Sequence, residues 1–311
     1  EEEARELIQR YILGRPESIE SKLAQDRSLR IYTLSLIASE VVSSLKGLLD
    51  FFNFTFFGFQ YKEVPFLENK IKNILNDLGN WRFIEKNDDK LSSTFLGRRI
   101  SCLYLDPKTA HFFIQALKMT QDLGISDLTI LQIIAYSDEM QPSLNLRHKD
   151  LEQLMDIVNS HKGEILMDVP LAWDDNYEDF LRSLKTALCF LEWIEETDEA
   201  SLLERFQITP GELYNKLEIV DWLIYALIEI AKVLGLRKVI RYLKRLRIRL
   251  NYGIKEELIE LVSLSQIGRV RARRLFEAGI KDISSLRKAP LETINRILGK
   301  KIALKVKEQL K

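Results

Sequence analysis

The chain has 311 residues, enough for two or three domains at roughly 150 residues each. Hydrophobic residues make up 46% and charged residues 30%, which is an ordinary globular composition. Two cysteines, Cys102 and Cys189, and three scattered histidines exclude a disulfide framework, a zinc finger and a histidine-rich metal centre. From these counts we expect no metal site. No apolar stretch approaches the ~20 residues that cross a bilayer, so we also expect no membrane partner.

The net charge of zero hides a segregation of charge along the chain. Residues 235–311 hold 21 Lys and Arg against 7 Asp and Glu, a net charge of +14. The other 25 basic and 39 acidic residues lie in 1–234, which leaves a net charge of −14 there. This pattern indicates either a polyanionic partner for the basic end or a solvated basic face that the acidic body partly neutralises.

The first third of the chain has the pattern of a winged helix. Residues 1–13 predict a short amphipathic helix that ends at residues 14–16 (GRP). Further on, a polar turn at 87–90 (NDDK) joins two extended segments, and the second of them runs to Leu105. Three helices followed by a β-hairpin is the winged-helix order. The helical patterns that precede the hairpin cover 28–41, 43–53 and 66–79.

The middle of the chain shows only helical patterns. Asp106 and Pro107 supply an N-cap and a first helical residue for the first of them. Residues 254–311 then form a last, basic, helical unit. The helical patterns before that unit lie near 107–122, 127–136, 149–162, 177–196, 199–206, 210–234 and 236–250.

The sequence lacks the motifs of a self-contained enzyme. There is no phosphate-binding G-x-x-x-x-G-K-[ST] loop, no H-E-x-x-H and no Ser/His/Asp arrangement, so we expect no catalytic residue. The acidic pair Asp138-Glu139 has no partner loop, and we interpret it as solvated surface. The run Phe51–Phe59 carries six phenylalanines in nine residues, and we interpret it as core packing because large apolar side chains are mostly buried.

The predicted helix at 210–234 has two unlike faces. A Thr-Pro-Gly-Glu start supplies an N-cap, a first-turn proline and a capping box. One stripe of the helix is apolar and should pack into the domain, whereas Trp222 lies nearly opposite that stripe. Asn215 precedes Trp222 by two turns, or ~10.5 Å. The tryptophan is either buried on a helix that packs on both sides, or it stacks on nucleic-acid bases without reading their sequence.

The helix at 236–250 and the segment that follows it carry clusters of cations. Arg237 and Arg241 share one face of the helix, where phosphate or an internal acidic partner would relieve their repulsion. Residues 264–280 resemble a helix–hairpin–helix, in which Gly268 opens a helix and free backbone N–H groups favour an anion. A weaker copy follows at 297–303. The first copy carries Arg269, Arg271, Arg273 and Arg274, which would bind phosphate or form only a solvated basic face.

Four segments carry a resemblance to a known family. They are residues 11–17 (YILGRPE), 96–100 (LGRRI), 209–214 (TPGELY) running into 221–223 (DWL), and 267–273 (IGRVRAR). The chain resembles the archaeal Hjm-type helicases, which are Holliday-junction-migration DNA helicases of superfamily 2. In that family two RecA-like motor domains precede a winged helix, a seven-helix ratchet bundle and a C-terminal helical domain. The resemblance therefore implies a mainly α chain without its motor, divided into 1–16 (the motor's tail), 17–106, 107–252 and 253–311.

The resemblance also implies a function. Family members unwind forked and branched DNA in the 3′→5′ direction during fork repair and recombination, with ATP and magnesium bound in the motor domains. This chain would bind single-stranded and forked DNA and have no ATPase activity or cofactor of its own. Its partners would be the motor domains and replication or recombination proteins, in the cytoplasm and nucleoid of an archaeal cell. The alternative is a non-catalytic interaction module whose basic end docks on an acidic partner.

Individual residues follow from the same resemblance. Trp222 matches the family's base-stacking tryptophan, and Asn215 stands where some members have a strand-contacting arginine. Arg98 and Arg99 in the winged helix would touch duplex DNA or only pack on the motor. The residues predicted to contact DNA are Trp222, Asn215, Arg237, Arg241, Gly268, Arg269, Arg271, Arg273 and Arg274.

Overall fold

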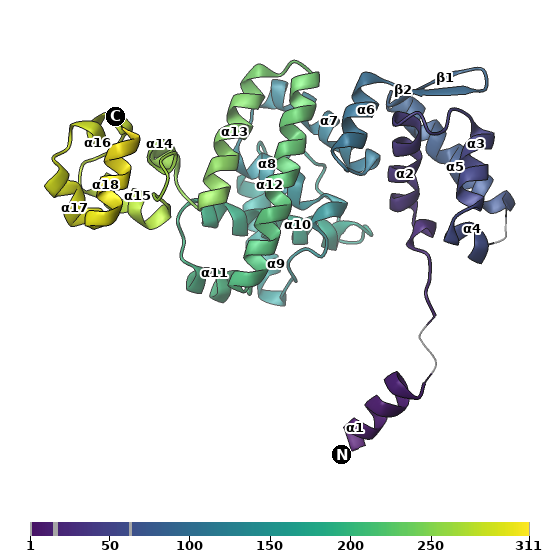
Figure 1. The fold of residues 1–311 in the computed structure, drawn as a ribbon, viewed down its shortest axis with the longest axis horizontal. Helices are drawn as coiled ribbons and strands as arrows, with labels where there is room; N and C mark the ends of the chain where they lie inside the picture. The colour runs from purple at the N-terminus through teal and green to yellow at the C-terminus, as the bar shows by residue number, and fades with distance from the viewer. Residues whose placement is uncertain (1, 15–17, 62–63, 311) are drawn as a thin grey trace. The chain divides into compact units, whose positions relative to one another are not determined.

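The computed structural model describes residues 2–14, 18–61 and 64–310 (Figure 1). The chain forms two compact units, Glu1–Lys108 and Thr109–Lys311. Helices dominate both, and the only sheet in the described ranges is a two-stranded hairpin, so the predicted mainly α fold is confirmed. The four-part division at residues 16, 106 and 252 stays a prediction.

The first unit has the winged-helix order. The hairpin strands pair antiparallel with Asn87 opposite Lys90, and Asp88 takes the left-handed conformation (φ 52°) that the predicted Asn/Asp turn requires. Of the segment predicted to end the first helix, residues 15 and 16 lie outside the described ranges. The elements are α1 (Glu2–Leu7), a π-helical turn (Ile8–Ile12), a 3-10 turn (Lys22–Ala24), α2 (Asp26–Ala38), α3 (Leu45–Asn53), α4 (Phe56–Gln60), α5 (Val64–Asn80), β1 (Ile84–Asn87), β2 (Lys90–Ser93) and α6 (Phe95–Cys102).

Helix α6 corrects the prediction of an extended run to Leu105. Thr94 is its N-cap: the hydroxyl accepts a hydrogen bond from the Gly97 amide at 3.0 Å and donates one to the Arg82 carbonyl at 2.8 Å. Gly97 is required here, since a Cβ on it would lie 1.8 Å from the carbonyl oxygen of Phe83. The capping threonine and the close approach together start a helix directly after the hairpin.

The phenylalanine run is only partly core, so that prediction was wrong for most of its residues. Phe52 and Phe57 are buried, at 0% and 2% exposure. The helical backbone is interrupted at Phe54 and Thr55, between α3 and α4, so the six rings cannot share one helix face. The exposed rings are Phe51 (40%), Phe54 (94%), Phe56 (48%) and Phe59 (73%).

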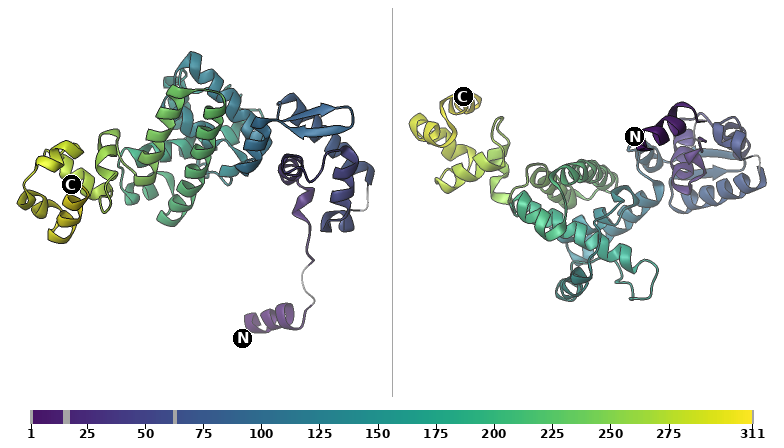
Figure 2. Two further views of the ribbon diagram at one scale, coloured as in Figure 1. Left: turned by 45° about the horizontal axis from the view of Figure 1, so that its top comes forward. Right: turned by 90° about the horizontal axis from the view of Figure 1, so that it is seen from below.

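The second unit begins with seven α-helices in its described residues, and Figure 2 shows them from two further directions. Helix α8 is buried from Leu128 to Ala135 on every side, which is typical of a central helix. Helices α10 and α12 pack against it, and α13 packs along α12. These helices are α7 (Pro107–Leu123), α8 (Asp127–Ala135), α9 (His148–Ser160), α10 (Tyr177–Ile194), α11 (Glu199–Phe206), α12 (Pro210–Val233) and α13 (Arg237–Tyr252).

The acidic pair at Asp138-Glu139 is solvated surface only in part: Asp138 is exposed as predicted, but Glu139 is not. It lies in a 3-10 turn (Asp138–Met140), where Glu139 is only 6% exposed. Its carboxylate accepts a hydrogen bond from the Thr109 hydroxyl at 2.8 Å. Glu139 therefore ties this turn to the start of α7 and is buried for a structural reason.

The C-terminal part of the second unit has an apolar core of its own. Leu261, Leu275, Ile294 and Val306 are fully buried or nearly so and belong to one cluster. Its elements are a 3-10 turn (Glu256–Leu258), α14 (Ile259–Val262), α15 (Arg269–Glu277), α16 (Ile283–Lys288), α17 (Leu291–Leu298) and α18 (Lys300–Gln309).

Candidate nucleic-acid interface

Helix α12 begins as the sequence predicts. Thr209 accepts a hydrogen bond from the Glu212 amide and Glu212 accepts one from the Thr209 amide at 2.9 Å, which completes the capping box. Hydrogen bonds from the backbone and side chain of Thr209 lower the pKa of Glu212. The predicted apolar stripe of α12 is buried at Leu213, Val220 and Leu227. The first half of α12 is therefore held on one side, whereas every residue from Ala226 to Ala231 is buried, so its second half is enclosed on all sides.

The opposite side of α12 carries the two predicted strand contacts. Asn215 is exposed and Trp222 is partly exposed. They are seven residues apart, so they project from nearly the same side of the helix, ~10.5 Å apart along its axis. Next to Trp222, Asp221 accepts two hydrogen bonds from Arg247 of α13, at 2.7 and 2.6 Å. This bidentate pair fixes the registration of α12 against α13.

Basic helix α13 divides its cations between internal and outward positions. Arg237 and Arg241 are exposed, as is Lys244. Arg245, one turn after Arg241 on the helix, instead pairs with Glu256 at 2.7 Å. Arg249 is only 7% exposed and pairs with Asp127 and Glu195. The C-terminal half of α13 thus has the internal acidic partners that the sequence left as one alternative. The N-terminal half presents exposed positive charge.

Two arginines of the first hairpin contact the bundle. Arg273 pairs with Glu196 through its Nε at 2.7 Å and with Glu257 at 2.9 Å. Arg269 donates a hydrogen bond to the carbonyl oxygen of Thr197 at 2.7 Å. Its guanidinium carbon lies 4.6 Å from the ring centroid of Trp193. These two side chains stand one turn apart on α15 and both face the α10–α11 corner.

The remaining hairpin residues are differently placed. Gly268 is the N-cap of α15, with an extended backbone (φ −100°). Arg271 donates a hydrogen bond to the carbonyl oxygen of Gln266 at 2.8 Å, within the hairpin itself. Arg274 is exposed. The predicted cluster of four therefore comprises two bundle contacts, one local contact and one outward cation.

The second hairpin keeps its cations outward. Lys300 and Lys301 are exposed at the start of α18, after Gly299 in a left-handed conformation (φ 83°). Lys307 is directed inward and donates to the carbonyl oxygens at the end of α16, with 2.7 Å to Ala289. The weaker copy in the sequence thus keeps both Lys300 and Lys301 exposed, whereas Arg274 is the one exposed arginine among the described residues of the first copy.

The two winged-helix candidates give little support to a duplex contact. Arg98 is exposed and pairs with Glu40 at 2.9 Å, and both side chains lie on the surface of the first unit. Arg99 is partly buried. The roles of Arg98 and Arg99 at duplex DNA or at the motor stay predictions.

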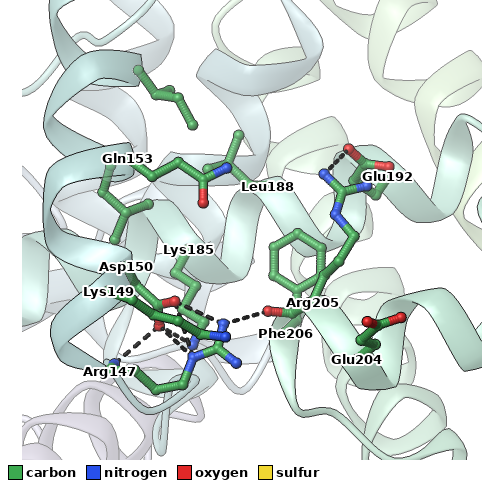
Figure 3. A pocket seen from close by; sticks show the side chains of 12 residues that line it. Arg147, Lys149, Asp150, Gln153, Lys185, Leu188, Glu192, Glu204, Arg205 and Phe206 are labelled. Atoms are coloured by element: carbon green, nitrogen blue, oxygen red, sulfur yellow. Dashed lines mark hydrogen bonds and ion pairs between the residues drawn. The ribbon is translucent and has the colours of Figure 1, made fainter.

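The bundle holds a cavity of about 330 Å³, and Figure 3 shows the side chains from α9, α10 and α11 that line it. Buried Lys185 donates to Asp150 at 2.7 Å, and Arg147 binds the same carboxylate at 2.7 Å. Burial alone would raise the pKa of Asp150, but hydrogen bonds from Arg147 and Lys185 lower it far below its usual range. Arg147 also donates to the carbonyl oxygen of Arg205. This network links the loop before α9 to α10 and α11, and we interpret it as structural.

The residues that sequence reasoning missed are Trp193, Glu196 and Gly253. All three lie where the bundle meets the C-terminal helices. A Cβ on Gly253 would come within 2.5 Å of the Trp193 ring, and Gly253 has a positive φ of 63°. The one available signal was the placement of a glycine directly after the basic helix, which is typical of a helix C-terminus and says nothing of a tryptophan.

No group of three or more His, Cys, Asp or Glu side chains in the described ranges could hold a metal ion. Among the same residues, none of the helices combines the length and apolar character of a membrane-spanning segment.

Comparison with known proteins identifies the parts of the chain. Residues 128–253 match the family model "Archaeal helicase, domain 4", and residues 258–311 match "SAM-like Helix-hairpin-helix tandem". The chain is 35% identical over 309 residues to "ATP-dependent DNA helicase Hel308" of Thermococcus kodakarensis, covering 99% of this chain and 27% of that protein. It is 40% identical over 291 residues to the Pyrococcus horikoshii protein of the same name, covering 93% of this chain and 40% of that protein.

A third relative, from Caldivirga maquilingensis, carries the same name and is 35% identical over 318 residues, covering 97% of this chain and 42% of that protein. The chain thus spans from about a quarter to two fifths of the length of these curated relatives, and it corresponds to their C-terminal part. The archaeal helicase domain, the helix–hairpin–helix tandem and the 35–40% identity confirm the resemblance: the chain belongs to the family of the archaeal Hel308 DNA helicases, whose C-terminal part it matches.

Proposed function

We propose that this chain is the part of an ATP-dependent 3′→5′ DNA helicase that holds single-stranded DNA while the motor moves. The observation that carries the proposal is α12, which is buried along one stripe and carries exposed Asn215 and partly exposed Trp222 on the other side. An indole can stack on any base, so it can resist backsliding without reading sequence.

The cations supply the affinity in this proposal. Outward positive charge lies on α13 at Arg237 and Arg241, and on the C-terminal helices at Arg274, Lys300 and Lys301. Each phosphate contact releases condensed counterions, so binding should weaken with salt at a log–log slope near −0.7 per contact for single strands. Gly268, Arg269, Arg271 and Arg273 stay predicted contacts, although the last three already have partners within the chain.

The energy source, the substrates, the partners and the place of action are proposed from the relatives' name and the family resemblance. Energy would come from ATP hydrolysis with magnesium in RecA-like motor domains, which are also a proposed partner. The substrates would be forked and branched DNA at sites of fork repair and recombination, with replication or recombination proteins as further partners. The place of action would be the cytoplasm and nucleoid of an archaeal cell.

The test is a fluorescence anisotropy titration of a labelled single-stranded oligonucleotide, a fork and a duplex with the chain over a salt series. We expect salt-dependent binding that favours the single strand and the fork. Trp222→Ala should weaken it by about 1–3 kcal/mol, or at least about fivefold. Trp173→Ala is the matched control, because Trp173 is a 79% exposed tryptophan of the same unit that lies in a loop.

Two outcomes would overturn the proposal. Equal effects of the two tryptophan substitutions would remove the stacking role from Trp222. An absence of DNA binding at low salt, together with capture of an acidic protein by the basic end, would favour the interaction-module alternative.

A further inference from the structure

The corner between α10 and α11 joins the bundle to the C-terminal helices through two side chains. Trp193 is the last aromatic residue of α10, and its Nε1 donates a hydrogen bond to the Leu250 carbonyl oxygen near the end of α13 at 2.8 Å. Its ring fills the space beside Gly253, where any Cβ would come within 2.5 Å of it. The ring therefore fixes the point at which the chain leaves α13 and enters the C-terminal helices.

The same ring also contacts the first hairpin. The Arg269 guanidinium lies over it at 4.6 Å from the centroid. Arg269 reaches past the ring to the Thr197 carbonyl oxygen at 2.7 Å. Trp193 is thus in contact with both ends of the connection between α13 and α15. A planar cation held over an indole and by a carbonyl has little freedom to move.

Glu196 makes the second set of contacts between this corner and the C-terminal helices. It adopts a left-handed conformation (φ 69°), which directs the chain around the corner. Its carboxylate accepts hydrogen bonds from the Lys255 amide at 3.0 Å and from Arg273 Nε at 2.7 Å. Its side chain is only 13% exposed. Burial would raise the pKa of Glu196, but the bonds from Arg273 and Lys255 lower it below its ordinary value.

We infer that Trp193 and Glu196 are positioning residues that orient α15, and so set where its outward cation meets DNA. Arg269 and Arg273 stand at i and i+4 on α15 and both bind the corner. With these two directed at the corner, Arg274 is rotated about 100° further round the helix and faces solvent. The inference rests on the proposed function, because it assigns the corner a role in presenting a DNA-binding helix.

Glu196→Gln separates positioning from simple electrostatics. The substitution removes a negative charge beside the arginines, and charge alone would therefore tighten binding to a polyanion. A positioning role predicts the opposite: the neutral amide loses the bidentate pairing with Arg273, α15 loosens, and single-strand affinity falls by about threefold or more. Glu277→Gln is the matched control, because Glu277 is an exposed carboxylate of α15 itself. It should leave affinity unchanged or raise it.

Two further measurements keep the inference falsifiable. Hydrogen exchange in α15 should speed up in Glu196→Gln and in Trp193→Ala, and stay unchanged in Glu277→Gln. In an Arg273→Ala background, Glu196→Gln should add nothing further to the loss of DNA affinity, because the two residues act through one contact. Additive effects, or a Glu196→Gln affinity equal to or above that of Glu277→Gln, would overturn the inference.

Failure of the inference is distinguishable from failure of the proposed function. If the unsubstituted chain does not bind single-stranded DNA, the proposed function fails. If it binds, and Glu196→Gln behaves as Glu277→Gln does in affinity and exchange, the function stands and the positioning role is wrong.

Discussion

The two helix–hairpin–helix copies at the C-terminus, one with four arginines and one with two lysines, place their cations differently. In the first copy, Arg269 and Arg273 bind the corner of the bundle. In the second, no ion pair within the described residues involves Lys300 or Lys301, and both are exposed. The number of cations in a sequence is therefore not the number that is available to bind phosphate. Two arginines of the first copy attach it to the bundle, whereas both lysines of the second copy are exposed.

The largest expected effect compares the glycine at which the chain leaves α13 for the first copy with the glycine that precedes α18 in the second copy. Gly253→Ala places a Cβ within 2.5 Å of the anchored Trp193 ring at a positive φ, so it should cost about 2–4 kcal/mol of unfolding free energy. Gly299→Ala meets no atom within 4 Å, and only its backbone conformation (φ 83°) is strained, so it should cost about 1–3 kcal/mol. Urea unfolding of both variants measures the order. A larger loss at Gly299 would contradict the idea that the first copy is the tightly attached one.

The next effect concerns the cations themselves. Arg273→Ala removes a largely buried pairing with Glu196, whose side chain is 13% exposed, and should cost about 1–2 kcal/mol of stability. Lys301→Ala removes an exposed side chain and should change stability by less than about 0.5 kcal/mol. Thermal unfolding of both variants at pH 7 makes the comparison. Equal losses would show that the two copies are attached alike.

Acidification should weaken the attachment of the first copy to the bundle. The pKa of Glu196 is lowered in the folded chain, so its stabilising contribution is present above the ordinary glutamate range near about pH 4.3. It is lost as the pH falls through the lowered folded-state value, because the unfolded state takes up the proton first. The stability difference between the unsubstituted chain and Glu196→Gln should therefore shrink below about pH 4.3. A stability difference that stays constant from pH 7 to pH 3 would show that the Glu196 carboxylate does not stabilise this attachment.

The smallest effects are changes of salt slope. Lys300→Ala with Lys301→Ala should reduce the slope for single-strand binding by about 1.4, and Arg274→Ala should reduce it by about 0.7, because each phosphate contact contributes about 0.7. Neither change should alter stability. Anisotropy titrations over a salt series measure both, and an unaltered slope in the lysine variant would assign the second copy no contact with phosphate.

The sequence predicted most helices because their signals are local. The start of α12 lies in four adjacent residues, Thr209 to Glu212, and the structure confirms it. The sequence missed α6 because its cause is partly non-local: Gly97 is needed only where the helix approaches the Phe83 carbonyl. It misjudged the phenylalanine run because a break at Phe54 and Thr55 divides the rings between two short helices.

The candidate site could likewise be predicted from the sequence only where its signals are local. Helical spacing places Asn215 and Trp222 on one side of α12, and the structure leaves both at least partly exposed. Spacing could not tell that Arg273 would meet Glu196, because 77 residues separate them in sequence. Residue type and period give the face of a helix; the partner of that face depends on the tertiary fold.

The exposed phenylalanines of the first unit have a practical consequence for the chain in solution. Phe54 and Phe59 are 94% and 73% exposed, and apolar surface of this kind promotes self-association. The formal net charge is zero at pH 7, so electrostatic repulsion between molecules is weakest there. We therefore expect solubility to pass through a minimum near neutral pH and to recover at pH 8.5 or above, and Phe54→Ser to reduce light scattering most at that minimum.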